Sequence, residues 1–230
     1  MKKALTLILF AAVAISCSFV INNKHVRGNG VEATRSYDLP AFSEIYVAGS
    51  MDVIFTQGPQ SITLTADENL LDIYTIESVD NILKISVKSG YSISTKAKTF
   101  VAVSSEDLNK VKLAGSGECD INGTLATKGD FAFYISGSGD LDADRIICNA
   151  FSAKVNGSGD VEVDALTAES ASLVINGSGD IKIGCKDVGD ITAKINGSGD
   201  IAVSGKARSI SSKVNGSGDV HSSGLAISRE

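Results

Sequence analysis

The tetrapeptide Gly-Ser-Gly-Asp recurs at a nearly fixed interval through the second half of this 230-residue chain. A variant with glutamate in the fourth place begins at Gly115, and the copies begin at Gly137, Gly157, Gly177, Gly197 and Gly216. The steps between these first glycines are 22, 20, 20, 20 and 19 residues. A period near 20 without a helical pattern predicts stacked coils, because one such unit cannot bury its own apolar face.

Short runs in which apolar and polar residues alternate flank each tetrapeptide. Leu-Val-Ile-Asn at 173–176 precedes one copy, and Ile-Lys-Ile at 181–183 follows it. Alternation with period two indicates a half-buried strand, and β-branched residues suit a packed sheet. Because glycine tolerates positive φ, both glycines of each tetrapeptide are expected to let the chain turn sharply. The turn glycines predicted in this way are Gly115, Gly117, Gly137, Gly139, Gly157, Gly159, Gly177, Gly179, Gly197, Gly199, Gly216 and Gly218.

Coils stacked in register place like residues above like residues at about 4.8 Å. The valine and isoleucine columns are then the core, and an asparagine ladder is predicted at Asn156, Asn176, Asn196 and Asn215. Each aspartate of the tetrapeptide is expected to accept hydrogen bonds from backbone N–H groups of its own turn. A row of calcium sites along these aspartates is an alternative, which the spacing disfavours because calcium-binding β-helices repeat about every nine residues.

The first half keeps the same alternation without the regular tetrapeptide. Gly-Ser-Met-Asp at 49–52 indicates that residues 45–55 form a degenerate coil in which Met51 replaces the second glycine. Gly-Pro at 58–59 is a hairpin-type turn signal. Residues 67–72 favour a helical turn capped by Asp67, with two leucines facing inward. Further strands are expected within residues 61–65, 73–77, 82–87 and 99–103.

Aromatic residues gather in this irregular half, where they are expected to fill a wider coil or to close the end of the solenoid. If the protein binds a ligand, this half is a better candidate for recognition than the uniform repeats. The residues predicted to contact such a ligand are Tyr46, Tyr74 and Tyr91.

The N-terminus has the features of a secretory signal over residues 1–16, with two lysines followed by a short apolar stretch. Ala-Ile-Ser before Cys17 fits ordinary cleavage and also fits a lipoprotein box, in which Cys17 becomes the lipidated N-terminus. We favour the second interpretation, with residues 17–36 as a tether to the membrane. The solenoid is then expected over residues 37–228, irregular at 37–110 and regular at 111–228.

Charge and composition exclude several classes of function. The formal net charge of −6 and the lack of a basic stripe argue against nucleic-acid binding. Cys119, Cys148 and Cys185 occupy different offsets within the repeats, so they are expected to be small buried hydrophobic residues. No histidine or cysteine spacing indicates a metal site, and no cofactor is expected. Acidic pairs such as Asp142 and Asp144 resemble those of polysaccharide-cleaving β-helices, but a solvated strand face has the same pattern.

Four segments together carry a family resemblance: Phe-Ser-Glu-Ile at 42–45, Ala-Gly-Ser-Met-Asp-Val at 48–53, Ala-Asp-Glu-Asn-Leu-Leu at 66–71, and the Gly-Ser-Gly repeats from 115 on. In them the chain resembles the bacterial head GIN domain family, an autotransporter-like adhesin domain of unknown function. The resemblance implies a right-handed, single-stranded β-solenoid (β-helix) without a recognised catalytic set. It also implies a secreted protein or lipoprotein of a Bacteroidetes-type Gram-negative bacterium, and it carries over no binding residues.

These observations predict an all-β protein that is not an enzyme. It is expected to be a cell-envelope lipoprotein of the outer membrane, or otherwise a secreted or periplasmic protein, that acts as an adhesin for a glycan or protein. A structural or signalling role inside the envelope is the first alternative, and a polysaccharide-active β-helix enzyme is the second. The final coil, around residues 214–227, leaves open whether its own tail or another chain, as in a homo-oligomer, covers it.

Overall fold

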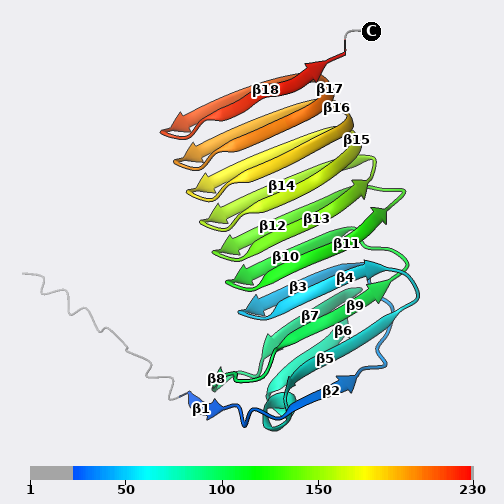
Figure 1. Ribbon diagram of the computed structural model, residues 1–230, viewed down its shortest axis with the longest axis vertical. Helices are drawn as coiled ribbons and strands as arrows, with labels where there is room; N and C mark the ends of the chain where they lie inside the picture. The colour runs from blue at the N-terminus through cyan, green and yellow to red at the C-terminus, as the bar shows by residue number, and fades with distance from the viewer. Residues whose placement is uncertain (1–22, 229–230) are drawn as a thin grey trace, which may run out of the picture.

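A computed structural model of the protein describes residues 23–228 and shows a β-solenoid of stacked parallel coils with about six turns (Figure 1). Strands make up 71% of the chain and helix 3%, as the repeat pattern predicts. The expected signal segment and the lipidation site at Cys17 lie outside the described residues.

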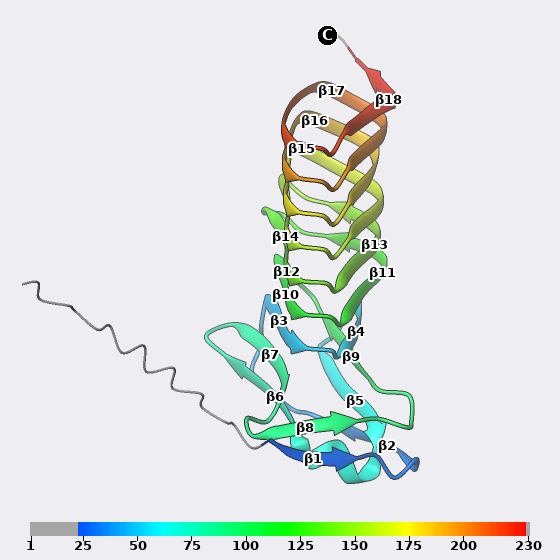
Figure 2. The ribbon, with the colours of Figure 1, turned by 90° about the vertical axis from the view of Figure 1, so that its left-hand side faces the viewer.

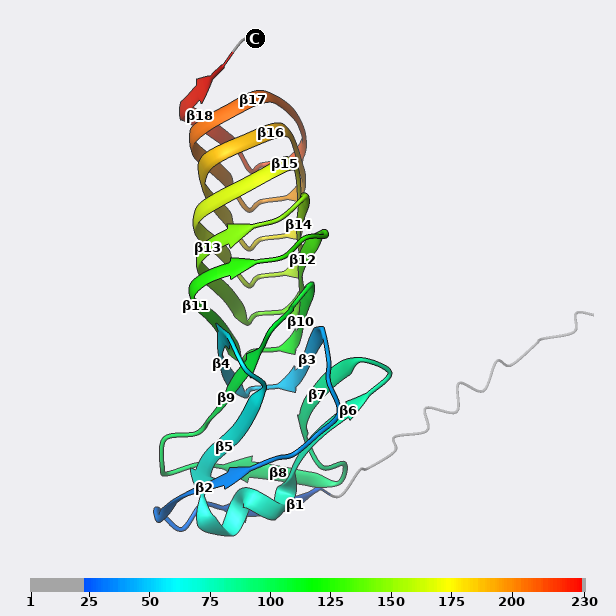
Figure 3. The ribbon, with the colours of Figure 1, turned by 90° about the vertical axis from the view of Figure 1, so that its right-hand side faces the viewer.

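The coils form two layers of parallel strands that face each other across the core (Figures 2 and 3). Layer 1 contains β3 (Glu44–Gly49), β10 (Lys110–Gly115), β12 (Phe131–Gly137) and β14 (Ala150–Gly157). Layer 2 contains β4 (Asp52–Gln57), β11 (Glu118–Ala126), β13 (Asp140–Ile147) and β18 (Val220–Ile227). Three long strands, β15 (Val161–Gly177), β16 (Ile181–Gly197) and β17 (Ile201–Gly216), begin in layer 2 and bend into layer 1.

Each coil therefore has one sharp corner and one gentle corner. The tetrapeptide makes the sharp corner, between a layer 1 strand and the layer 2 strand that follows it. At the opposite corner the strand bends, and the pairing register shifts there, as between Cys185 and Val188. Such irregularities let a strand change direction without ending. The looser turn expected from the sequence is thus a bent strand in the last full coils.

The two glycines of the tetrapeptide have different roles. The first glycine has positive φ, between 141° and 153° from Gly137 to Gly216. The second glycine does not have the positive φ that the sequence analysis assigned to it, and it is buried. It is needed because the coils approach closely there: a Cβ atom on Gly179 would lie 2.0 Å from the carbonyl oxygen of Gly159. Conformation and space therefore both restrict the first position, whereas space alone restricts the second.

The core between the layers consists of columns of apolar side chains. Leu113, Ile135, Val155, Ile175 and Ile195 stand in register on successive layer 1 strands, and each is at most 1% exposed. Beside them, three phenylalanines (Phe131, Phe133 and Phe151) pack together, with edge-to-face ring contacts at 5.0 and 6.0 Å. The three cysteines Cys119, Cys148 and Cys185 are buried and free.

Two polar ladders run along the sharp corner. Asn176, Asn196 and Asn215 each donate an amide hydrogen bond to the asparagine of the coil before, at 2.8, 2.8 and 2.9 Å. The aspartates accept hydrogen bonds differently from the expectation. Asp160 Oδ1, for example, accepts from the backbone N–H of Asp180, at 2.7 Å. Each carboxylate therefore binds the next coil rather than its own turn, which joins the coils to one another.

An insertion closes the N-terminal end of the stack. The coil formed by β3 and β4 is the predicted degenerate copy, since Gly49 pairs with Gly115. The chain then leaves the stack and returns to it at β10. In between it forms β5 (Ser61–Asp67), η1 (Glu68–Ile73), β6 (Tyr74–Val79), β7 (Ile82–Val87), β8 (Tyr91–Ser94) and β9 (Phe100–Ser105). β7 and β9 pair with β3 and β4, so the insertion covers their free edges.

Three details of this closed end differ from the expectations. The expected tether region contains β1 (Lys24–Arg27), which pairs with β8, and β2 (Glu32–Ser36), which pairs with β5. Gly58-Pro59 does not close a hairpin, because β9 lies between β4 and β5. Asp67 precedes a 3-10 helix but makes no side-chain cap, and its buried carboxylate accepts hydrogen bonds from the backbone N–H groups of Gly30, Lys96 and Ala97. Burial opposes ionisation of Asp67, yet these donors lower its pKa.

Candidate functional site: the lysine–tyrosine face

The outer surface of layer 1 carries a column in which lysines alternate with tyrosine or valine, except for two successive lysines at its C-terminal end. The pairing register places Lys84, Tyr46, Lys112, Tyr134, Lys154, Val174, Lys194 and Lys213 side by side on successive strands from β7 to β17. These side chains are exposed or half-buried, since their strand neighbours face the core. We call this surface the lysine–tyrosine face.

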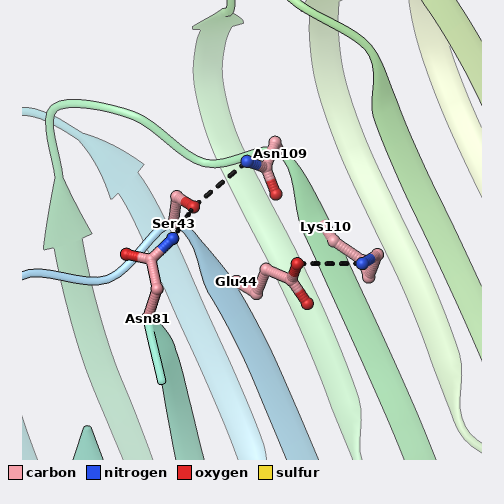
Figure 4. Close-up of polar contacts among 5 residues, drawn as sticks. All are labelled: Ser43, Glu44, Asn81, Asn109 and Lys110. Carbon is pink, nitrogen blue, oxygen red and sulfur yellow. Dashed lines mark hydrogen bonds and ion pairs between the residues drawn. The ribbon is translucent and has the colours of Figure 1, made fainter. Parts of the chain in front are cut away.

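Polar contacts fix the register where the face begins (Figure 4). Ser43 Oγ accepts hydrogen bonds from the side-chain amides of Asn81, at 2.6 Å, and Asn109, at 3.1 Å. Asn81 can reach Ser43 because Asp80 and Asn81 both have positive φ in the tight turn between β6 and β7. The three residues lie at the starts of β7, β3 and β10, so these contacts hold the first three members of the column level.

Two contacts then orient side chains on this face. Lys112 Nζ lies 5.3 Å from the centre of the Tyr46 ring, which is a cation–π contact across neighbouring strands. In the adjacent column Lys110 Nζ forms an ion pair with Glu44 Oε1 at 2.9 Å (Figure 4). The Glu44 carboxylate is therefore neutralised locally, while Glu77 on β6 stands in register with Lys84 at the edge of the face. Among residues 23–228, no carboxylate forms an ion pair with the lysines of the lysine–tyrosine column itself.

A groove runs beside the column. A hollow of about 520 Å³ is lined by Tyr46, Lys84, Lys112 and others, and a larger one of about 1110 Å³ extends to β16. Lys110 and Tyr134 line both, so the two hollows adjoin at these residues. Small side chains form the floor, because Ala132, Ser152, Ser172 and Thr192 stand in register two residues before the lysine–tyrosine column.

Loop residues 106–109 and 126–130 form the opposite rim of the groove. The second loop belongs to the 22-residue step of the repeat, so the longer coil supplies part of the wall. Four acidic residues line the larger hollow, and two of them, Asp190 and Asp130, are occupied by side-chain partners, whereas Glu106 and Asp107 have no such partner within residues 23–228. Asp190 binds Arg208 at 2.6 Å and accepts from Ser209 Oγ at 2.7 Å, and these contacts lower its pKa to about 2. Asp130 accepts a hydrogen bond from Asn149 at 3.0 Å.

Layer 2 has the opposite charge on its outer surface. Asp120, Asp142 and Glu162 stand in register on β11, β13 and β15, and Glu162 forms an ion pair with Lys182 on β16. Burial, together with the charges of Asp120 and Glu162, raises the pKa of Asp142 to about 6. Repulsion by Asp120 raises the pKa of Glu118, and partial burial raises that of Asp120. The solenoid thus presents a lysine-rich outer surface and a carboxylate-rich one.

The acidic surface also contains a group that could hold a cation. Ligand atoms of Glu118, Asp120 and Asp142 lie within 4.8 Å of one another. Glu118 is the glutamate of the variant tetrapeptide and stands in register with Asp140, whereas Asp120 and Asp142 stand two residues further along layer 2. The group therefore only partly coincides with the column of tetrapeptide acids that the sequence offered as a calcium row. Exposed carboxylates of adjacent strands often approach in this way without an ion.

The tyrosines predicted to contact a ligand are not brought together. Tyr46 lies on the lysine–tyrosine face and lines its hollow. Tyr74 is 5% exposed in the core of the closed end, where burial raises its pKa to about 12. Tyr91 is half-buried on β8, with Lys24 Nζ 5.9 Å from its ring centre. Of the three, Tyr46 alone belongs to the candidate site, and Tyr74 is unavailable to a ligand.

Sequence reasoning missed Tyr134 and the lysine column, although the repeat contained the signal. Lys112, Tyr134, Lys154, Lys194 and Lys213 each stand three residues before the first glycine of a tetrapeptide, and Tyr46 stands three residues before Gly49. Because each offset becomes a column when coils stack, reading the chain at this one offset would have predicted the face.

Comparisons with known proteins agree on the fold. The family model described as "Putative auto-transporter adhesin, head GIN domain" matches residues 41–226. A solved "putative adhesin" from Bacteroides fragilis is 20% identical and covers 86% of this chain and 99% of its own, with a TM-score of 0.72. A "putative adhesin" from Parabacteroides merdae is 23% identical, covers 86% and 98%, and has a TM-score of 0.67.

A third solved structure, from Parabacteroides distasonis, is described as a "putative lipid binding protein". It is 24% identical and covers 86% of this chain and 99% of its own, with a TM-score of 0.57. No curated protein matches the chain. The part of the chain that the structure describes holds no helix long and apolar enough to cross a membrane.

Proposed function

Because the chain belongs to the head GIN domain family, whose name and solved relatives suggest an adhesin of the cell envelope, we propose that it is a non-catalytic binding protein. Its ligand is a glycan or a protein, and the lysine–tyrosine face is the surface that binds it. Attachment to the outer membrane is by the lipid on Cys17.

The observation that carries this proposal is the groove beside the column. It combines a ring that lines both hollows, Tyr134, with exposed lysines and a floor of small side chains. Ligand sites are typically concave and combine apolar surface with a few polar groups. Paired strands of layer 1 form the column and the floor of the groove, so binding costs little ordering of these parts of the protein.

The test compares two tyrosine variants of the purified protein on arrays of glycans and extracellular-matrix proteins. Tyr46→Ala combined with Tyr134→Ala removes both rings from the groove, and Tyr91→Ala removes a half-buried ring outside it. We expect the double variant to lose binding while Tyr91→Ala keeps it, with circular dichroism showing that both are folded. Binding that survives the double variant would place recognition elsewhere on the molecule.

Protease treatment of intact cells tests the proposed location. Digestion of the protein before permeabilisation supports an adhesin that faces outward. Protection until the outer membrane is opened would favour the alternative, a structural or signalling component inside the envelope.

A further inference from the structure

We propose that the ligand of the lysine–tyrosine face is a linear acidic polysaccharide that carries about one negative charge per disaccharide unit and lies along the column, across the coils. This inference deepens the function proposed above and rests on it. It follows from the order of residues in the column, from its spacing, and from the separation of charge between the two layers.

Positively charged and uncharged side chains alternate along most of the column. From β7 to β16 the column reads Lys84, Tyr46, Lys112, Tyr134, Lys154, Val174 and Lys194, so a lysine stands on every second strand. The alternation ends there, because Lys213 on β17 follows Lys194 directly. Neighbouring strands are about 4.8 Å apart, which separates successive lysines by about 9.6 Å. That distance is comparable to one disaccharide unit of an extended polysaccharide. A chain with one carboxylate or sulfate per disaccharide could therefore meet each lysine in turn.

The residues between the lysines suit the rest of a sugar chain. Tyr134 lines both hollows and lies between Lys112 and Lys154, where its ring can support the apolar face of a sugar ring. Tyr46 has a second role, since its contact with Lys112 holds that ammonium group in place. Val174 offers a smaller apolar surface at the next interval.

The lysine column and the acidic column lie on opposite layers of the solenoid. The whole chain is acidic, with a formal net charge of −6, yet the lysines of the column form no ion pairs within residues 23–228. Of the carboxylates at the groove, Glu44 is paired with Lys110 and Asp190 with Arg208. In contrast, Glu106, Asp107 and Asp130 lie at the loop rim, across the groove from the column, without an ion pair in the described part of the chain. The acidic column on layer 2 lies on the other side of the core. An anionic chain is therefore attracted to layer 1 and repelled from layer 2.

Three polysaccharides distinguish spacing from simple charge attraction. Hyaluronan carries one carboxylate per disaccharide, polygalacturonate carries one per sugar, and dextran is neutral. The full-length protein is immobilised, and binding of size-matched fragments is measured by biolayer interferometry from low to high salt. We expect hyaluronan to bind, dextran not to bind, and polygalacturonate to bind no more tightly than hyaluronan although its charge is doubled.

Charge-matched variants assign the binding to the column. Replacing Lys112, Lys154 and Lys194 with Gln should weaken hyaluronan binding by about tenfold or more, since each exposed charge pair contributes up to roughly fivefold. The control replaces Lys182, Lys186 and Lys206 with Gln, which are exposed lysines outside the column, and should change the affinity less than about twofold. All variants are checked for an unchanged melting temperature.

A register variant tests the spacing itself. Lys154→Val combined with Val174→Lys keeps the net charge but moves one lysine to the next strand, about 4.8 Å along the column. We expect this swap to weaken hyaluronan binding by about threefold or more, which corresponds to most of one exposed charge pair. Equal affinity before and after the swap would overturn the inference that the lysine spacing matters, and nonspecific electrostatic attraction would then account for the binding.

Two further outcomes would also overturn the inference. If the protein binds neutral glycans or proteins through Tyr46 and Tyr134 and ignores acidic polysaccharides, the ligand class is wrong while the proposed function stands. If sedimentation shows salt-sensitive self-association that the column variant abolishes, the face binds the acidic layer of a second copy instead.

Discussion

Replacing a single first glycine of the tetrapeptide with alanine, Gly177→Ala, should destabilise the solenoid strongly, because the substitution meets two obstacles at once. Gly177 has φ of 151°, and a Cβ atom there would lie 2.0 Å from the carbonyl oxygen of Gly157. Unfavourable φ costs about 1–2 kcal/mol in a non-glycine residue. Forcing an extra methyl group into a packed site costs about 1–3 kcal/mol more. The expected loss of unfolding free energy is therefore about 2–5 kcal/mol.

The chain offers variants that separate the two obstacles. Gly49 has φ of 102° with no atom within 4 Å of an added Cβ, so Gly49→Ala isolates the conformational cost of about 1–2 kcal/mol. Gly179 lacks positive φ but lies against Gly159, so Gly179→Ala isolates the steric cost of about 1–3 kcal/mol. Gly129 has neither obstacle, so Gly129→Ala should leave stability unchanged or raise it by up to about 1 kcal/mol.

Urea unfolding followed by circular dichroism measures these differences, with melting temperature as a second readout because solenoids can unfold coil by coil. We expect Gly129→Ala to be the most stable of these variants and Gly177→Ala the least stable, with Gly49→Ala and Gly179→Ala between them. The valine variants Gly157→Val and Gly177→Val should lose more than about 1 kcal/mol, since β-branched residues tolerate positive φ poorly. A Gly177→Ala protein as stable as Gly129→Ala would refute the assignment of this glycine to a strained corner.

Three other changes test the ladder, the acidic surface and the core. Asn176→Ala removes the amide hydrogen bonds to both neighbouring asparagines and should cost about 1–2 kcal/mol of unfolding free energy. Asn156→Ala removes one such bond and should cost less. Equal melting temperatures for these two variants would contradict the ladder. Asp142 has a pKa of about 6 in the folded protein against an ordinary 3.8, so folding favours its protonated form. The stability that the protonated carboxyl contributes is therefore lost as the pH rises from about 4 to 6. Asp142→Asn should accordingly raise the unfolding free energy by about 1 kcal/mol at pH 7.5 after allowance for solvent screening, and change little near pH 3.5, which melting curves at both pH values would check. Phe133→Ala removes edge-to-face contacts with two phenylalanines and should cost about 3–5 kcal/mol in urea unfolding; a loss below about 1 kcal/mol would show that the cluster does not hold the core together.

The sequence was enough to predict the solenoid because one pattern is repeated. Every coil needs the same corner, so the same tetrapeptide recurs, and the columns of apolar side chains follow from stacking alone. The closed end was harder to predict. Strands β5, β6, β7 and β9 were placed to within a few residues, but β8 was not predicted, and β1 and β2 lie in the expected tether. The pairing of β9 between β4 and β5 depends on contacts across the fold that no local turn signal reports. Gly58-Pro59 shows this, since its turn chemistry fits a hairpin that the topology does not form.

Side-chain roles were predicted less well where two partners competed. Asp67 has the residue type and position of a helix cap, but three backbone N–H groups from distant loops bind its carboxylate instead. The tetrapeptide aspartates likewise bind the next coil and not their own turn, as Asp180 does through its contact with Asp200. In both cases the carboxylate accepts no hydrogen bond from its own local motif, and backbone N–H groups from elsewhere in the fold donate to it instead.

The same repetition that made the fold predictable also accounts for the candidate site. In a solenoid, an outward offset within the repeat becomes a column with fixed spacing of about 4.8 Å, so the choice of residue at that offset sets a pattern along the surface. From Gly115 on, both corner offsets hold glycine, because a Cβ there would clash with the backbone of the preceding coil. The offset three residues before the first glycine is free of that constraint, and from Tyr46 to Lys194 it alternates between lysine and an uncharged tyrosine or valine. Structure alone does not require that alternation, since an all-polar column would stack equally well. A binding face with a charge on every second strand is the reason we infer for it.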